Sequence, residues 1–496
     1  MMQITQTENL LDTIKKLNPW FRDNTVPGKF LKPYIRNELK TLINTIDKTE
    51  LATLLIGGRR VGKSVLMYQL IDHLLKTGVE GKKILFIQGD NPIIREHDED
   101  SNILNTIIRT YEKYVLDRDL NTIDDKIYIF LDEAQSMPKW DSEIKSLIDL
   151  KYPIKFFITG SSSAKLRKGA QSPLVGRIYA AILPPFTFKD FFDYELKTNN
   201  SIDMGKSLEI TRNKFIEALK NEDKDGIVDA IDTISKQIIS YNPSELFEDF
   251  ILYGGFPYVV ENRTKEDVNK YLKDILLMTF SRDILQEEQI REPMAFERLM
   301  VNICSNISGI FKYKSLAERV GLKDERTIRR YIDYYIDSHY VSVSNQFSFT
   351  NKQDSITSAN KKLYVIDTGL INTLLFKNQQ DIRSDTAYRG VLIENIIHNS
   401  ILDFKQAVTG NLYDTVPHWE NTKTHKEIDF IFQPDGQMYP VEVKAKDYIS
   451  EDELIEIRSF LAIKKTNKIG FVVTNKTSET RENLILLPAY IFSLLV

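Results

Sequence analysis

The 496-residue sequence contains one cysteine, Cys304, so no disulfide bond can form within the chain. A protein without disulfides fits the reducing environment of the cytosol. The first residues, MMQITQTENLLDT, lack the basic start and the apolar run of a signal peptide. The most apolar stretch, residues 484–496, is too short to span a bilayer and contains Pro488. We therefore expect a cytoplasmic protein without a membrane partner.

Neither sign of charge dominates the composition. The sequence has 66 Lys and Arg residues and 70 Asp and Glu residues, which gives a net charge of −4. Bulk charge therefore argues against a protein that coats nucleic acid, although a local basic patch stays open. Apolar residues make up 42% and charged residues 27%, so the chain can bury real cores. Its length predicts roughly two to four domains.

Short apolar runs alternate with helical patterns between residues 51 and 183. LATLLI, KILFIQ, IYIFLD and IKFFIT have the composition of buried strands, and VLMYQLIDHLL has helical spacing. This alternation predicts a parallel sheet covered by helices on both faces. We assign residues 1–190 to an N-terminal segment and this core. A polar helical region at 191–290, a compact module at 291–350 and a mixed α/β region at 351–496 complete the chain.

The stretch GGRRVGKS, residues 57–64, fits the phosphate-loop pattern G-x-x-x-x-G-K-[ST] between a predicted strand and a predicted helix. Backbone N–H groups of such a loop surround phosphate oxygens, and the helix N-terminus adds its positive end. Lys63 would reach the β- and γ-phosphates, and the Ser64 hydroxyl would ligate Mg²⁺. Gly57, Arg60 and Gly62 complete the predicted ATP-binding loop.

Two further strands supply the other groups that ATP hydrolysis needs. IYIFLDEAQ ends in Asp132, which would hold Mg²⁺ through water, and Glu133, which would orient or deprotonate the attacking water. IKFFITGSSS ends in polar residues, of which Thr159 or Ser161 could sense the γ-phosphate. The sequence therefore predicts a complete ATP·Mg²⁺ site.

The order GGRRVGKS, IFLDEAQ, ITGSSS and GR resembles the AAA+ superfamily, in particular its prokaryotic origin-recognition and signal-transducing branch, over residues 39–257. The resemblance implies ATP and ADP as ligands, and that Arg177 contacts a phosphate in its own subunit or in a neighbouring one. A salt-bridged structural arginine is the alternative. Both a homo-oligomer and a monomer fit this branch. The YGGFP stretch, residues 253–257, also recurs in it, and we interpret it as a structural turn.

Residues 313–344 have the layout of a winged helix-turn-helix. A helix over 315–320 ends at Gly321, Asp324 is a candidate N-cap for a second helix over 325–338, and a β-like wing comes after it. Arg326, Arg329 and Arg330 lie at helical spacing and could meet DNA. Residues 312–339 hold seven Lys and Arg against five Asp and Glu, a slight excess for phosphate binding. A protein-contact or lid module is therefore the alternative.

The stretch KEIDFIFQPDGQMYPVEVK predicts a β-hairpin that turns at residues 434–436. Asp429 lies on one arm, and Glu442 and Lys444 share a face of the other. Pairing about the turn would bring Asp429 opposite residue 441 or 442. Upstream, Glu394 interrupts the apolar stripe of a predicted helix. Buried carboxylates are costly unless paired or bound to metal, so these groups predict a site for Mg²⁺ or Mn²⁺.

A helix Glu, then Asp, then Glu-x-Lys resembles the PD-(D/E)xK restriction-endonuclease-like superfamily. The resemblance implies that Glu394, Asp429 and Glu442 hold the metal and that Lys444 positions and acidifies the attacking water. Ile428 stands where the superfamily's name has proline. A fold retained to bind DNA or protein is the alternative to an active nuclease. We interpret His398, one turn after Glu394, as a helix-surface histidine.

The sequence thus predicts an α/β protein made of a P-loop AAA+ parallel-sheet domain, a helical lid, a winged helix and a C-terminal restriction-endonuclease-like α/β domain. This combination resembles a widespread prokaryotic family. The functional expectation is an ATP-binding and ATP-hydrolysing switch coupled to DNA binding and metal-dependent nuclease chemistry, in DNA processing or defence. The alternative is a signal-transducing ATPase whose terminal domain is a non-catalytic module that binds DNA or protein.

Overall fold

The computed structural model describes residues 2–95, 102–160, 174, 176–199, 202–263, 268–278, 290–349, 353–354, 360–411, 413–421, 426–463 and 468–496. The chain divides into two compact units, residues 1–183 and 184–496. No helix in the described part of the chain combines the length and the apolar character needed to cross a bilayer.

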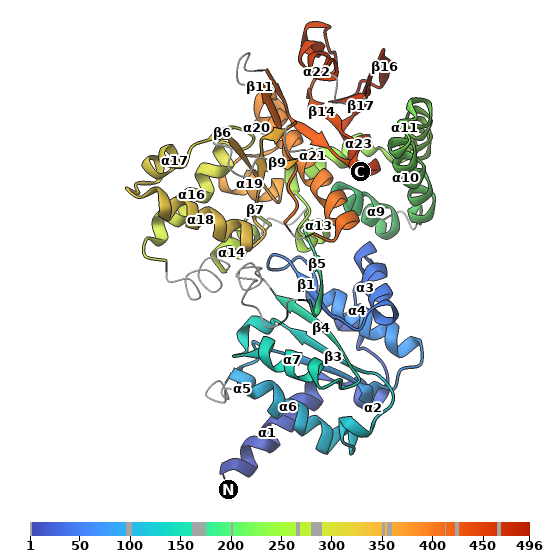
Figure 1. The fold of residues 1–496 in the computed structure, drawn as a ribbon, viewed down its shortest axis with the longest axis vertical. Coiled ribbons are helices and arrows are strands. Elements are labelled where there is room, and N and C mark those ends of the chain that lie inside the picture. Colours follow the sequence, from blue (N-terminus) through green and yellow to red (C-terminus); the bar gives the residue numbers. More distant parts are fainter. Residues whose placement is uncertain are drawn as a thin grey trace. The chain divides into compact units, whose positions relative to one another are not determined.

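The first unit is built on a five-stranded parallel sheet (Figure 1). Its strands are β1 (Ala52–Ile56), β2 (Ile84–Gln88), β3 (Ile127–Asp132), β4 (Ile154–Gly160) and β5 (Ile178–Ile182), in the order β2-β3-β4-β1-β5. Every neighbouring pair is parallel. Strands β1 and β3 are buried along their whole length, as expected for a sheet with helices on both faces. The predicted parallel sheet is therefore confirmed.

The first unit contains seven described α-helices, and the first three of them precede β1, in the N-terminal segment. They are α1 (Met2–Leu17), α2 (Trp20–Asp23), α3 (Asn37–Lys48), α4 (Lys63–Lys76), α5 (Pro92–Arg95), α6 (Ile103–Tyr111) and α7 (Trp140–Asp149). Asn18 is fully buried, and its side chain bonds to both the N–H and the carbonyl of Phe86 in β2. The Trp20 indole donates to the carbonyl of Ile84. The segment before the phosphate loop is therefore an integral part of this core.

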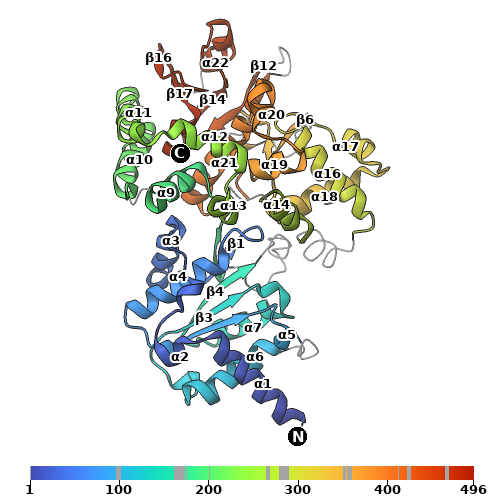
Figure 2. The ribbon, with the colours of Figure 1, turned by 180° about the vertical axis from the view of Figure 1, so that it is seen from behind.

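The second unit begins with helices. These are α9 (Phe188–Asn199), α10 (Gly205–Lys220), α11 (Lys224–Ile238), α12 (Pro243–Tyr253), α13 (Pro257–Asn262) and α14 (Val268–Met278). Helices α10 and α11 lie side by side (Figure 2) and both contact the last helix, α23 (Ala489–Leu495). The helical region therefore packs against the end of the chain.

The YGGFP stretch joins α12 and α13 to α19 (Thr368–Leu374). Gly254 has φ of 72°, and a Cβ there would lie 2.3 Å from an Asp367 oxygen. The N–H of Gly255 donates to the buried Asp367 carboxylate at 2.6 Å. A Cβ on Gly255 would lie 1.9 Å from the Phe186 carbonyl oxygen. The stretch is therefore a turn in which backbone segments approach too closely for any side chain.

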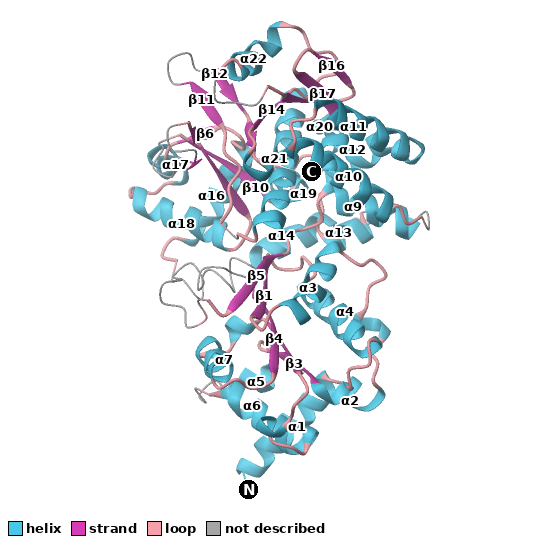
Figure 3. Cartoon of the chain, turned by 45° about the vertical axis from the view of Figure 1, so that its right-hand side comes forward, coloured by secondary structure: helices cyan, strands magenta, loops and turns pink. Residues whose placement is uncertain are grey.

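A three-stranded antiparallel sheet and three helices form the middle of the second unit (Figure 3). The helices are α16 (Pro293–Ser305), α17 (Tyr313–Val320) and α18 (Glu325–Asp337), and the strands are β6 (Ile310–Phe311), β7 (Val341–Asn345) and β10 (Lys361–Val365), in the order β6-β10-β7. Gly321, with φ of 85°, ends α17, and the Asp324 side chain accepts the Arg326 N–H at the start of α18. Strand β10 lies beyond residue 350, so the boundary drawn there divides this sheet. The short strands β8 (Phe347–Ser348) and β9 (Gln353–Asp354) pair with each other.

The last part of the chain is a mixed five-stranded sheet with helices. Its strands are β13 (Phe430–Phe432), β14 (Tyr439–Val443), β15 (Gly470–Thr474), β16 (Glu479–Arg481) and β17 (Leu484–Pro488), in the order β13-β14-β15-β17-β16. The three central strands are parallel and the two outer ones antiparallel to their neighbours. A separate pair is formed by β11 (Trp419–Asn421) and β12 (Lys426–Ile428), and the helices are α20 (Gln379–Ser384), α21 (Thr386–Thr409) and α22 (Ile455–Leu461). The predicted hairpin between β13 and β14 is present and turns at Pro434–Gly436.

We predict that Gly255→Ala destabilises the protein by about 1–3 kcal/mol, because the added methyl group would press against a main-chain oxygen that cannot rotate away. Urea unfolding followed by circular dichroism measures the change. Gly390→Ala is the matched control: this glycine lies inside α21, and the nearest atom to an added Cβ is 3.8 Å away. The control should be neutral or more stable, by up to about 1 kcal/mol. Equal stability of the two variants would contradict this account of the turn.

Candidate functional site

The phosphate loop connects β1 to α4, which begins at Lys63. Two of its glycines are required by the backbone. A Cβ on Gly57 would lie 2.3 Å from the Leu183 carbonyl oxygen, and Gly62 has φ of 104°. Val61 is fully buried and anchors the loop in the core. Arg60 has φ of 63°, an uncommon value for a residue with a side chain. The loop thus exposes its backbone N–H groups at the N-terminus of a 14-residue helix.

The ammonium group of Lys63 lies over this loop. It donates to the carbonyl oxygens of Gly57 and Gly58 at 3.0 and 2.9 Å, and it is 3.9 Å from Glu133 Oε1. Only 4% of the Lys63 side chain is exposed. The structure therefore places the lysine and the candidate catalytic carboxylate on the same side of the loop.

Hydroxyl groups hold the carboxylate at the end of β3. Ser64 Oγ donates to Asp132 Oδ2 at 2.7 Å, and Thr159 Oγ1 donates to Asp132 Oδ1 at 2.5 Å. Burial raises the pKa of Asp132, and these two hydrogen bonds oppose the rise. Thr159 reaches Asp132 because β4 lies between β1 and β3 in the sheet. Ser64 and Asp132 are hard oxygen donors of the kind that Mg²⁺ prefers, so they fit that ion.

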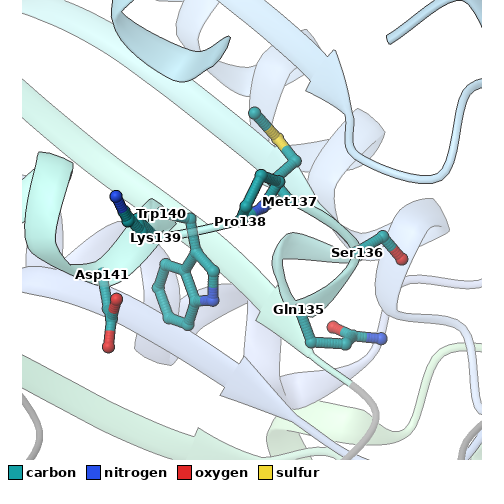
Figure 4. Close-up of a pocket in the computed structure, with 7 residues that line it drawn as sticks. All are labelled: Gln135, Ser136, Met137, Pro138, Lys139, Trp140 and Asp141. Carbon is teal, nitrogen blue, oxygen red and sulfur yellow. The ribbon is translucent and has the colours of Figure 1, made fainter. Parts of the chain in front are cut away.

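Glu133 follows Asp132 in a left-handed backbone conformation, with φ of 50°. Its N–H donates to Thr159 Oγ1 at 2.9 Å, and its Oε2 accepts from Gln135 Nε2 at 2.6 Å. Sequence reasoning missed Gln135, although it belongs to the same LDEAQ stretch. Residues 135–141 line a pocket (Figure 4). Gln135 thus contacts Glu133 and borders the pocket.

Two further residues, Ser161 and Arg177, were predicted to belong to the nucleotide site. Ser161 lies outside the described residues. Arg177 precedes β5, and its carbonyl accepts the N–H of Ala52 at the start of β1. Strand β1 spans about 16 Å from that end to the phosphate loop. Arg177 Nε instead donates to Asp149 Oδ1 at 2.7 Å. Within its own chain, Arg177 therefore lies at the edge of the sheet away from the phosphate loop.

A second set of charged groups lies at the hairpin of β13 and β14. Phe430 pairs with Val441, so the next position outward sets Asp429 opposite Glu442. Asp429 Oδ2 accepts the N–H of Val443 at 2.8 Å. Lys444 Nζ lies 2.8 Å from Glu442 Oε1, which confirms that these two side chains share one face of the strand. The expected register is therefore present.

Glu442 is buried, with 5% of the residue exposed. Its Oε2 atom has no hydrogen-bond partner among the described residues. Burial, and next the negative charge of Asp429, raise the pKa of Glu442 to about 8, against the opposing effect of Lys444. A buried carboxylate with an unsatisfied oxygen has a strong demand for a proton or a cation.

Glu394 approaches the same region from α21. Its Oε1 accepts from the Tyr364 hydroxyl at 2.8 Å and lies 3.7 Å from Lys362 Nζ. Burial and then Asp429 raise the pKa of Glu394 to about 8, while Lys362 lowers it. Lys362 also forms ion pairs with Glu427 and, at 4.0 Å, with Asp429. Sequence reasoning missed Lys362 and Glu427, because no local motif marks them.

Within the described part of the chain, no three His, Cys, Asp or Glu side chains are gathered closely enough to hold a metal ion. Lys362 lies between the carboxylates that were expected to do so. His398, expected on the helix surface, is instead fully buried and stacked on the Tyr364 ring at 4.0 Å, and burial lowers its pKa to about 3. The interpretation as a surface histidine was wrong, because Tyr364 of β10 and Phe430 of β13 pack against the His398 ring.

The three arginines of α18 differ in their surroundings. Arg329 lies over the Tyr313 ring at 4.4 Å and pairs with Glu325 at 3.4 Å. All three arginine residues, Arg326, Arg329 and Arg330, are exposed. The helix therefore presents a short basic face to solvent.

Residues 49–192 match the family described as an AAA domain. Together with the parallel sheet and the phosphate loop, this match decides the nature of the first unit. Residues 49–192 form a P-loop AAA ATPase domain. This match supports ATP binding and hydrolysis by this domain and the use of Mg²⁺ with the nucleotide. Residues 244–381 and 389–492 match two families described as domains of unknown function, DUF8612 and DUF4143.

Other proteins are similar to this chain over most of its length. An uncharacterized protein of Methanocaldococcus jannaschii is 26% identical over 406 residues, which cover 80% of this chain and 75% of that protein. An uncharacterized protein of Haemophilus influenzae is 22% identical, over 82% of this chain and 85% of that protein. Among solved structures, the Walker-type ATPase PABY2304 of Pyrococcus abyssi is similar with a TM-score of 0.36 and 16% identity, covering 69% of this chain and 96% of that one.

Proposed function

We propose that this protein couples ATP hydrolysis in its AAA domain to a second unit that binds DNA and carries a cation-dependent, nuclease-like carboxylate site. The observation that carries the second half of the proposal is the buried Glu442 carboxylate, which pairs with Lys444, faces Asp429 and keeps an unsatisfied oxygen. A buried ion pair of this kind is costly to stability if its role is purely structural, because replacing both partners by apolar residues often stabilises a protein.

In the AAA domain, each polar side chain at the loop has a separate task. Lys63 exchanges its two carbonyl partners for the β- and γ-phosphates, since phosphate oxygens are stronger acceptors. Ser64 and Asp132 hold Mg²⁺, and Glu133 orients the water that attacks the γ-phosphate. Thr159 links Asp132 to the N–H of Glu133, so it fixes the relative position of both carboxylates. Arg177 lies far from its own phosphate loop and pairs with Asp149, so it would serve either as a structural arginine or on a neighbouring subunit's nucleotide.

In the second unit, the charge balance supports a divalent cation. The charged groups that converge there are Glu394, Glu427, Asp429, Glu442, Lys362 and Lys444. The pKa values of Glu394 and Glu442 are each raised to about 8, so both groups must lose a proton before the cluster can hold a cation. When they are ionised, four carboxylates against two ammonium groups leave two negative charges, which is the charge that one Mg²⁺ or Mn²⁺ ion neutralises. Carboxylate oxygens are the ligands that these ions prefer, and Glu442 Oε2 is unsatisfied. These donors are of the kind that such an ion takes, but no three of them are gathered closely enough among the described residues, so side chains would have to move before the ion binds.

When bound, a divalent cation at such a site would stabilise the negative charge that develops on a phosphodiester during hydrolysis. Glu442 and Asp429 would hold it. Lys444, fixed 2.8 Å from Glu442, would orient the attacking water and lower its pKa. Glu394 would complete the ligand set from α21.

The middle of the second unit supports a winged helix that binds DNA. That fold has the order helix, strand, helix, helix, strand, strand, and its first strand pairs with its last. This order is followed by α16, β6, α17, α18, β7 and β10, and β6 pairs with β10. Arg326 and Arg330 would contact phosphates. Arg329 would contribute less, because its guanidinium already stacks on Tyr313 and pairs with Glu325.

A signal-transducing ATPase with a non-catalytic terminal domain is the second candidate. The observation that favours it is Lys362, an ammonium group already paired with Glu394, Glu427 and Asp429. A lysine in this position can keep the carboxylate cluster intact without a metal ion. The terminal domain would then serve to bind DNA or protein.

Lys63→Ala should abolish nucleotide binding, whereas Glu133→Gln should retain binding and lower ATP turnover by about 10²–10⁴-fold, because the amide cannot accept a proton from water. Fluorescent-nucleotide titration and phosphate release measure the two effects. Lys76→Ala, at the exposed end of α4, is the control and should change neither. Undiminished hydrolysis in the Glu133 variant would refute its assigned role.

Cleavage of plasmid or branched DNA with Mg²⁺ or Mn²⁺ tests the nuclease proposal. We expect Glu442→Gln and Lys444→Met to lower cleavage by at least about 100-fold, because each removes a charge at the reacting centre. Lys446→Met is the matched control, since this lysine pairs with Glu453 at the surface and should be dispensable. Cleavage that persists in both site variants would contradict the proposal, and no cleavage by the unmodified protein would favour the second candidate.

The double variant Arg326→Ala and Arg330→Ala should weaken DNA binding by about tenfold and reduce its salt dependence by roughly one or two phosphate contacts. Fluorescence anisotropy of labelled duplex DNA over a series of salt concentrations measures both quantities. Arg329→Ala should have the smaller effect. If affinity and salt dependence both stay unchanged in the double variant, α18 is not the DNA-binding helix.

A further inference from the structure

Strand β10 belongs to the sheet of the proposed winged helix, yet two of its side chains enter the carboxylate cluster. Lys361–Val365 pairs with β6 and β7, and neither of these strands is part of the hairpin sheet that carries Glu442. Because side chains alternate along a strand, Lys362 and Tyr364 share one face. Lys362 pairs with three carboxylates, and Tyr364 donates to one of them, Glu394.

The surroundings of Lys362 are those of a bound cation. Only 4% of its side chain is exposed, and its ammonium group lies 3.7 Å from Glu394 Oε1 and 4.0 Å from Asp429 Oδ1, with Glu427 in contact. A buried ammonium group is stable only when it is fully paired, so these carboxylates hold it as they would hold an ion. Lys361, its neighbour, lies on the other face of β10.

We propose that Lys362 is the resident cation of the carboxylate cluster and competes with a divalent ion for Glu394 and Asp429. The inference rests on the proposed function and deepens it, because it names what controls metal occupancy of that site. With Lys362 in place, the described residues hold no group of three ligands close enough for a metal. Glu442 Oε2 is buried and has no hydrogen-bond partner among the described residues, so it remains available to a cation while Lys362 is paired with the other carboxylates.

If Lys362 is the resident cation, the position of β10 controls whether the carboxylates are free to bind a metal ion. Metal occupancy would require Lys362 to leave Glu394 and Asp429, and Lys362 can leave only by a change in side-chain conformation or by a shift of β10. A shift of β10 would also move the sheet to which it is hydrogen-bonded. Lys362 therefore links the state of the proposed winged helix to the cation content of the proposed nuclease site.

Binding of Mn²⁺ to the full chain, followed by electron paramagnetic resonance of the free ion, tests the inference without nuclease activity. All variants carry Asp132→Asn, so that the phosphate-loop site contributes less binding. Lys362→Met keeps the length of the side chain and removes its charge. We expect this variant to bind Mn²⁺ at least about tenfold more tightly than the unmodified site, and Glu442→Gln to reverse the gain. Lys361→Met is the matched control and should leave the affinity unchanged.

Thermal unfolding gives a second measurement. Lys362→Met should unfold at a lower temperature in EDTA, and Mn²⁺ should restore its stability, because the ion replaces the missing positive charge. Should this variant fail to fold, Lys362→Met combined with Glu427→Gln removes one charge of each sign and should show the same gain in Mn²⁺ affinity.

The outcomes separate this inference from the proposed function. A gain in affinity that depends on Glu442 would support the role of Lys362 whether or not the protein cleaves DNA, and absence of DNA cleavage alongside this gain would count against the proposed nuclease alone. Tight Mn²⁺ binding by the unmodified site, equal to that of Lys362→Met, would preserve the proposed nuclease and overturn the role of Lys362. A loss of stability in Lys362→Met that Mn²⁺ does not restore, with no gain in affinity, would also overturn it.

Discussion

The cost of burying a carboxylate governs both candidate sites. Asp132 is 4% exposed and Glu442 is 5% exposed, and neither could be tolerated there without partners. In the AAA domain the partners are the hydroxyl groups of Ser64 and Thr159, which satisfy both oxygens of Asp132. At the hairpin, Lys444 satisfies only one oxygen of Glu442. The first site is therefore complete as a hydrogen-bonded unit, whereas the second keeps an unmet demand for positive charge, and its chemistry depends on that demand.

One short stretch, residues 361–367, connects three parts of the second unit. Its strand pairs with β6 and β7, its Lys362 and Tyr364 contact the carboxylate cluster, and its Asp367 accepts the N–H of Gly255 in the YGGFP turn. Burial raises the pKa of Asp367 to about 6 although backbone N–H groups stabilise its charge. Each of these contacts is between residues distant in sequence, so the arrangement depends on the whole unit being folded.

Local patterns predict a large part of this structure. The phosphate loop, the strand ending in Asp132 and Glu133, the capped helix α18 and the hairpin turn at 434–436 are all set by residues within a few positions of one another. The rest depends on contacts that no local pattern encodes. The polar tract before β10 has the composition of a linker, so sequence reasoning places the strand after it in the next domain. His398 was expected on the helix surface, and its burial depends on residues of other elements, among them Tyr364 of β10 and Phe430 of β13.

The same distinction separates the two lysines of the carboxylate cluster. Lys444 stands two residues after Glu442, directly beyond the end of β14, so the contact between them is local and does not depend on another sheet. Lys362 reaches Glu394, Glu427 and Asp429 from another sheet, so its contacts persist only while β10 keeps its place. A motion of one sheet relative to the other would therefore leave the first ion pair intact and break the second. Lys362 is thus the cation of this cluster that a conformational change can remove, whereas Lys444 stays paired with Glu442.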